Sequence, residues 1–160
     1  MRLFLYLFKN NKMIIESLKS LYTRDLNKLK TEIEAYQNEK SIWKIDNNIS
    51  NSAGNLCLHL VGNLSHFVGT ILGNSGYVRN RELEFSLKDI PRTELIQQIE
   101  DTIEIVNSSL DKLAEPALGR EYPLEALGYK MTTEYFLIHL IAHLNYHLGQ
   151  INYHRRLLDL

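Results

Sequence analysis

The sequence predicts an all-α fold, a four-helix bundle with at least one crossover connection. Apolar residues recur every three or four positions over four long segments, which is the spacing of amphipathic helices. No alternating run is long enough to predict a sheet. The segments between the helices are too long for tight hairpins, which favours a crossover between helices of the bundle.

The first two helices follow from this spacing. We expect the first over about 12–38 and the second over about 52–72, where Asn and Ser side chains precede the apolar run and can cap its free N–H groups. The connection 39–51 is polar and holds the only Trp of the chain. The run Gly-Asn-Ser-Gly at 73–76 ends the second helix, and the charged segment 77–90 is expected to be irregular.

The last two helices are bounded by equally clear signals. Pro91 precedes a third helix with apolar residues over 95–110. The segment 115–130 contains two Pro and two Gly, so we expect a loop there. The last helix begins at Thr132 or Thr133 and runs to the end of the sequence, because no strong helix breaker interrupts it.

Length and composition are those of one ordinary domain. The chain has 160 residues, of which 44% are hydrophobic and 23% charged. We assign 13–160 to the bundle and 1–12 to an N-terminal extension or an extra helical turn. The short apolar run in that extension has no small-residue cleavage site and cannot span a bilayer, so we expect neither a signal peptide nor an anchor. Met13 begins the amphipathic pattern and is the alternative start of the protein.

Charge and cysteine usage exclude several classes of function. A net charge of -1 supplies no positive field for phosphate backbones, so no nucleic-acid partner is expected. The only cysteine, Cys57, excludes an internal disulfide and a multi-cysteine zinc module. It is compatible with the reducing cytoplasm, and we expect a cytoplasmic protein without a membrane partner. The wide apolar stripe of the second helix is explained either by a homodimer interface or by central burial of that helix.

The histidines carry the functional signal. All six lie on the second and fourth predicted helices, at His59, His66, His139, His143, His147 and His154. His143 and His147 lie one helical turn apart, so both imidazoles can reach one ion. His139 and His143 share this spacing, but the apolar stripe places His147 well inside the core face and His139 further out. On the second helix His59 and His66 are alternative third ligands. Structural histidines without a metal remain the competing interpretation.

Two motifs resemble those of the DinB/YfiT-like four-helix bundles. They are Asn-Ser-Ala-Gly-Asn-Leu-Cys-Leu-His-Leu-Val-Gly-Asn-Leu at 51–64 and His-Leu-Asn-Tyr-His-Leu-Gly-Gln-Ile at 143–151. The loop 79–85, with its Arg-x-Arg-x-x-Glu-Phe pattern, resembles an uncharacterised branch of that superfamily. The resemblance extends over about 13–158. It implies a divalent metal held by three histidines, one on the second helix and two four apart on the last. Carried over by motif, the ligands are His59, His143 and His147.

Three imidazoles leave one open position on a tetrahedral ion, as in catalytic zinc sites. We expect zinc, while nickel or iron would also accept imidazole ligands. The resemblance implies a metal-dependent enzyme, with a thiol-dependent S-transferase as the first hypothesis. Its partners would be a low-molecular-weight thiol, such as bacillithiol or mycothiol, and a small electrophile. The alternatives are a hydrolase-like member, a non-catalytic metal- or ligand-binding stress or sensor bundle, and an interaction module with structural histidines.

Four other polar residues are candidates for roles near the ion. Asn63 and Gln150 each lie within one helical turn of a proposed ligand and are placed to orient a ligand or a bound water. Arg79 and Arg81 could hold an anionic substrate, or could pair at the surface with the nearby Glu82 and Glu84.

Overall fold

The computed structural model describes residues 2–46 and 48–160, without the side chains of residues 2–12 and 115. Four long helices dominate this part of the chain, at α1 (Arg2–Glu34), α2 (Ala53–Leu64), α5 (Arg92–Lys112) and α6 (Thr133–Leu158). No β-strand occurs among the described residues, which contain one isolated bridge between Glu121 and Thr132. The all-α prediction is therefore confirmed.

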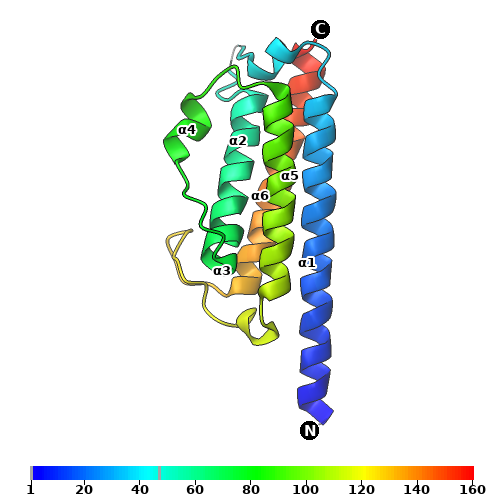
Figure 1. Cartoon of the computed structure of the whole chain (residues 1–160), viewed down its shortest axis with the longest axis vertical. Coiled ribbons are helices and arrows are strands. Elements are labelled where there is room, and N and C mark those ends of the chain that lie inside the picture. Colours follow the sequence, from blue (N-terminus) through cyan, green and yellow to red (C-terminus); the bar gives the residue numbers. More distant parts are fainter. Residues whose placement is uncertain (1, 47) are drawn as a thin grey trace.

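Helices that follow each other in the sequence are not always neighbours in the bundle. Helices α1 and α6 run in one direction, and α2 and α5 run in the other (Figure 1). The main contacts of α1 are with α5 and α6, and the same two helices flank α2. Helices α1 and α2 thus occupy opposite corners of the bundle, and the segment between them crosses from one corner to the other, as the long connection predicted.

Helix α1 ends four residues earlier than its apolar pattern predicts. Asn38 is the N-cap of a short 3-10 helix, η1 (Glu39–Trp43), and its side chain accepts a hydrogen bond from the backbone N–H of Lys40. The Asp159 carboxylate, from the far end of the chain, accepts the backbone N–H groups of Gln37 and Asn38. These side chains accept the backbone N–H groups of a turn in the place where the helix was expected to continue.

The second predicted helix is continuous, but its hydrogen-bonding pattern changes from α-helical to π-helical and back. Ser52 caps α2 by accepting the backbone N–H of Asn55 at 3.1 Å. A π-helical segment, η2 (Ser65–Thr70), and a last turn, α3 (Ile71–Gly73), follow without a break. The Tyr122 hydroxyl donates to the Phe67 carbonyl in the π-helical segment at 2.7 Å. Such wide turns leave backbone groups that need outside partners, and they occur often at functional sites.

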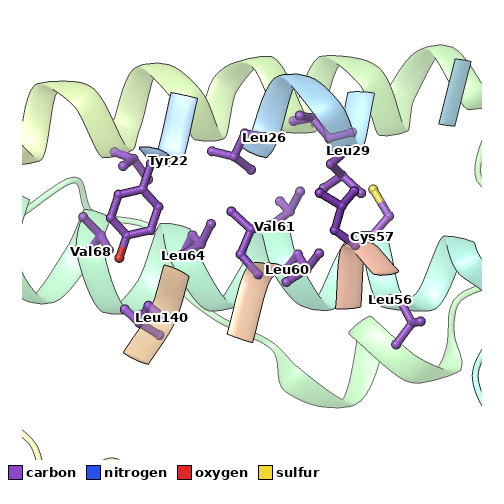
Figure 2. Packing of buried hydrophobic residues seen from close by; sticks show 14 of the residues in the cluster. Tyr22, Leu26, Leu29, Leu56, Cys57, Leu60, Val61, Leu64, Val68 and Leu140 are labelled. Carbon is purple, nitrogen blue, oxygen red and sulfur yellow. The ribbon is translucent and has the colours of Figure 1, made fainter. Parts of the chain in front are cut away.

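This second helix is the apolar centre of the bundle. Within Ala53–Gly73 an 18-residue window has a mean hydropathy of 1.4, and the helix is long and apolar enough to cross a membrane by length and composition alone. In the structure 67% of this window is buried by the other helices, as expected for the core helix of a bundle. Figure 2 shows Leu60 and Leu64 of α2 facing Tyr22 and Leu26 of the diagonal helix α1.

The segment expected to be irregular contains a helix. Helix α4 (Arg81–Ser86) is capped by the side chain of Asn80 and packs against α2. The Asn55 amide donates to the carbonyls of Glu84 and Leu87, at 3.1 and 2.9 Å, and so fastens α4 to the start of α2. Six residues are too few to display a helical period, which is why the sequence did not predict this element.

The remaining boundaries agree with the sequence. Helix α5 begins directly after Pro91. The loop before α6 contains one short 3-10 turn, η3 (Glu115–Ala117). Thr132 caps α6 by accepting the backbone N–H of Tyr135 at 3.2 Å, so the first residue in the helix is Thr133.

Candidate metal centre

Three imidazoles meet where α2 and α6 pack against each other. His59 lies in the middle of α2, and His143 and His147 lie one turn apart on α6. The Nε2 atom of His143 is 3.3 Å from Nε2 of His59 and 3.1 Å from Nε2 of His147. The structure therefore brings together the three histidines that the family resemblance implied, and this cluster could hold a metal ion.

The spacing fits a tetrahedral ion. With zinc–nitrogen bonds of about 2.0–2.1 Å, two ligating nitrogens lie about 3.3 Å apart. The ligand atoms of the three residues lie within 4.8 Å of one another. His59 is buried, while His143 and His147 are partly exposed, so solvent reaches the side of the cluster formed by α6.

Hydrogen bonds fix the tautomers of two of the rings. The Glu84 carboxylate can only accept, so the Nδ1 of His59, 2.8 Å from Oε2 of Glu84, carries the proton. The Nδ1 of His147 lies 2.7 Å from the amide oxygen of Gln150 and donates to it in the same way. In the neutral forms of both rings, Nε2 then carries a lone pair directed at the centre of the cluster.

Burial favours the neutral form of the two imidazoles on α6. Burial, with a smaller contribution from the positive charge of neighbouring groups, lowers the pKa of His143 to about 4. The pKa of His147 is also lowered, first by burial and then by His59, although the Gln150 bond acts in the opposite direction. Neutral imidazoles are the protonation state that metal binding requires.

Glu84 belongs to the site, although its sequence pattern predicted only a surface partner for the arginines. Its carboxylate is buried, and Arg79 donates to it twice, from Nε at 2.6 Å and from Nη2 at 2.9 Å. Burial raises the pKa of Glu84, but the hydrogen bonds from Arg79 and His59 outweigh it and leave the pKa below its ordinary value. An ionised carboxylate behind a ligating imidazole is a common arrangement in metal sites. The sequence pointed to Glu84 only through its place in the Arg-x-Arg-x-x-Glu-Phe pattern at 79–85.

A glycine on α2 makes room for this carboxylate. A Cβ atom added at Gly62 would collide with Oε1 of Glu84. Gly62 lies one turn from His59, on the face of α2 that α4 covers. The glycine thus permits Glu84 to approach α2 closely enough to reach the imidazole.

The two arginines have different surroundings. Arg79 is engaged by Glu84, and its guanidinium also lies 5.5 Å from the centre of the Phe67 ring. The ion pair between Arg79 and Glu84 is largely buried, whereas the sequence analysis placed such pairing at the surface. Arg81 is exposed and lies 5.4 Å from the centre of the Phe85 ring, which in turn packs against His59. Arg81 is therefore the better placed of the two for an anionic substrate.

The two amide candidates also differ. Gln150 contacts the cluster directly, through its bond to Nδ1 of His147. Asn63 is buried, and its Oδ1 has no hydrogen-bond partner among the described residues.

The remaining histidines lie outside the cluster. His154 is buried and bonded at both ring nitrogens, to the Tyr36 hydroxyl at 2.7 Å and to the Lys44 carbonyl at 2.9 Å. His139 stacks on Phe136 with an angle of 8° between the rings. His66 belongs to the π-helical segment, where it packs against Phe67.

The only cysteine is also outside the site. Cys57 is fully buried, and burial raises the pKa of its thiol to about 12. Such a thiol is neither a ligand nor a nucleophile at neutral pH.

Comparison with known proteins gives one match. The sequence model of a family described as "Protein of unknown function (DUF1572)" matches residues 8–159, which is nearly the whole chain. No curated protein and no solved structure matches the chain. The match covers α1 from residue 8 onward, the other three long helices and the three clustered histidines.

Proposed function

We propose that this chain, which belongs to the DUF1572 family, is a metal-dependent enzyme of the DinB/YfiT-like type that transfers a small thiol to an electrophile. The observation that carries the proposal is the meeting of three Nε2 atoms, those of His59, His143 and His147. Two of these atoms are left unprotonated by the hydrogen bonds on the opposite sides of their rings.

The donor set supports a borderline metal ion, with zinc first and nickel or iron as alternatives. When bound in such a site, the ion lowers the pKa of a thiol or a water at its open position and stabilises the resulting anion.

The residues around the cluster favour an anion at that position. Glu84 and Arg79 carry opposite charges and pair with each other, and imidazoles that bind a metal do so in their neutral form. The protein thus supplies no net negative charge to the centre, and an anionic thiolate from a cosubstrate would provide it. The thiol has to be a cosubstrate, because Cys57 is buried and its thiol stays protonated.

Each residue has a defined task in this proposal. Glu84 and Gln150 hold protons on Nδ1 of His59 and His147 and orient those rings. Arg79 keeps the Glu84 carboxylate ionised and in place. Arg81 stands at the exposed edge, where it can attract the anionic part of a cosubstrate.

Metal analysis of protein purified without an affinity tag tests the ion site. We expect about one transition metal per chain, and we expect His143→Ala to abolish ion uptake. His139→Ala is the matched control, because it removes a histidine one turn away on the same helix and outside the cluster. Metal-free wild-type protein with no uptake of added zinc would refute the site.

Enzyme activity is tested separately. The metal-loaded protein is incubated with a panel of cellular thiols and a neutral electrophile, and conjugate formation is compared with that of His143→Ala. We expect metal-dependent conjugation with at least one thiol. A filled site without conjugation across the panel would replace the enzyme by a non-catalytic metal-binding module.

A further inference from the structure

A cavity of about 390 Å³ lies next to the candidate metal centre. It is lined by the segment 48–51, the first turn of α2 and the last third of α6, and it is open to solvent on one side. Its volume is within the range of about 300–1,000 Å³ that is common for small-molecule sites. None of the tasks assigned above to individual residues uses this space.

The cavity and the histidine cluster share a wall. Leu56 lines the cavity three residues before His59 on α2, and Gln150 lines it three residues after His147 on α6. Because α2 and α6 are antiparallel, both steps lead one helical turn in the same direction along the bundle (Figure 1). Gln150 thus faces the cavity while its amide oxygen accepts the hydrogen bond from His147.

The lining is uncharged. Its apolar part consists of Ile49, Leu56, Tyr153 and Leu157. Its polar part is made of Asn48, Ser50, Asn51 and Gln150, and no Asp, Glu, Lys or Arg is among the described residues that line it. The one titratable imidazole in the lining, that of His154, is bonded at both nitrogens to neutral groups.

These surroundings determine the class of ligand. No charged side chain of the described residues lines the cavity, although the Arg156 guanidinium lies 5.5 Å from the centre of the Tyr153 ring. An ionised group that gave up hydration there would have no ion-pair partner in the lining, which is costly. An uncharged ring or alkyl group would be covered by the leucines and by Tyr153, and the amides and the serine would bind its neutral polar substituents. The amide oxygen of Gln150 is used by His147, so its NH2 group is what it offers to such a ligand.

We propose that this cavity binds the uncharged body of the electrophilic substrate and directs its reactive end past Gln150 toward the three histidines. The role of the cavity as a substrate pocket rests on the function proposed above, but its selectivity for uncharged ligands does not. The charged parts of the thiol cosubstrate lie outside it, on the side of Arg81.

The test is a binding measurement that needs no catalysis. The probes are 1,3-dinitrobenzene, which is uncharged and has no leaving group, and 3,5-dinitrobenzoate, which adds one carboxylate to the same ring. Nitroaromatic compounds quench tryptophan fluorescence, and the only tryptophan, Trp43, packs on Gly54 in the first turn of α2. The full-length protein is titrated before and after removal of metal with EDTA.

We expect saturable quenching by dinitrobenzene in both forms of the protein. Dinitrobenzoate should bind at least about tenfold more weakly, because its carboxylate finds no counter-charge. Leu157→Glu places a carboxylate in the lining at a residue that is 57% exposed, and it should weaken dinitrobenzene binding at least about fivefold. Ile138→Glu is the matched control, with 53% exposure on the same helix and about 28 Å away.

A second variant guards against an effect on folding. Ser50→Phe fills the cavity from an exposed loop position without adding charge, and it should also weaken dinitrobenzene binding. Equal affinity for the two probes, or unchanged affinity in both variants, would overturn the proposal. Since binding is measured without metal, failure here leaves ion uptake by the histidines unaffected. Conversely, if the histidines bind no metal, the selectivity of the cavity for uncharged ligands is unaffected.

Discussion

The carboxylate of Glu84 lies 2.8 Å from Nδ1 of His59, and the two residues come from helices that sequence analysis could not connect. His59 is in the core helix α2, whereas Glu84 is in the short helix α4. The bond holds the imidazole in the tautomer that directs its Nε2 lone pair at His143. The histidine cluster is thus oriented by α4, an element that contributes no ligand.

Removing the charge of Glu84 should weaken metal binding without removing a ligand. We expect Glu84→Gln to lower zinc affinity by about 10–100-fold, because the imidazole of His59 loses its ionised partner. The measurement is competition with a chromophoric zinc chelator. Glu82→Gln is the matched control, since Glu82 is exposed on the same helix. Equal affinities of the two variants would show that Glu84 does not orient His59.

The substitution Gly62→Ala should push the Glu84 carboxylate away from α2. The added Cβ collides with Oε1 of Glu84, so we expect a loss of about 1–3 kcal/mol in the free energy of unfolding and weaker zinc binding. Gly149→Ala is the control on α6, where an added Cβ meets nothing within 4 Å. That change should stabilise the protein by about 0.5–1 kcal/mol. The free energy of unfolding of both variants is measured in urea. An unchanged value for Gly62→Ala would contradict the close approach of α4 to α2.

Stability should depend on pH through His154. Burial lowers its pKa below the ordinary value of 6.5, and this effect outweighs the hydrogen bond to the Lys44 carbonyl, which raises the pKa. Between these two pKa values the unfolded chain binds more protons than the folded one, so the free energy of unfolding falls as the pH falls.

The matching variant is His154→Gln, which keeps a donor for the Lys44 carbonyl but does not titrate. In urea unfolding with EDTA at pH 7.5 and 5.5, the stability advantage of the wild type over this variant should shrink at the lower pH. An advantage that is constant or grows would show that His154 is not held neutral.

Cys57 should be inert in the folded protein. Its side chain is fully buried, and burial raises its pKa to about 12, so neither access nor thiolate is available. We expect a chromogenic disulfide reagent to label no thiol in native protein and one thiol per chain in guanidinium. Rapid labelling of the folded protein would show that the Cys57 thiol is accessible and reactive.

The sequence predicted what depends on periodicity. The four long helices, the capping run before the second helix and the start of the last helix at Thr132 or Thr133 follow from local patterns, and so does the placement of His143 and His147 on one face of α6. The choice of His59 over His66 needed the family resemblance, because both lie at similar angles on the second helix.

The sequence did not predict what depends on contacts between distant segments. Helix α1 ends early because Asp159 caps Gln37 and Asn38, more than 120 residues away in sequence. Glu84 and Arg79 belong to a charged segment whose pattern is that of a solvated surface, and only the packing of α4 on α2 buries their carboxylate and guanidinium. The π-helical turn at Ser65–Thr70 shifts the register of its helix with no Pro and only a single Gly, Gly69, inside it.

The central place of the apolar helix α2 has a consequence for the nascent chain. Synthesis delivers α2 before α6, which covers one side of α2 and carries two of the three clustered imidazoles. Until α6 has been made, the apolar helix Ala53–Gly73 lacks the part of its cover that α6 supplies. This segment is therefore where a chaperone that recognises exposed apolar surface would bind.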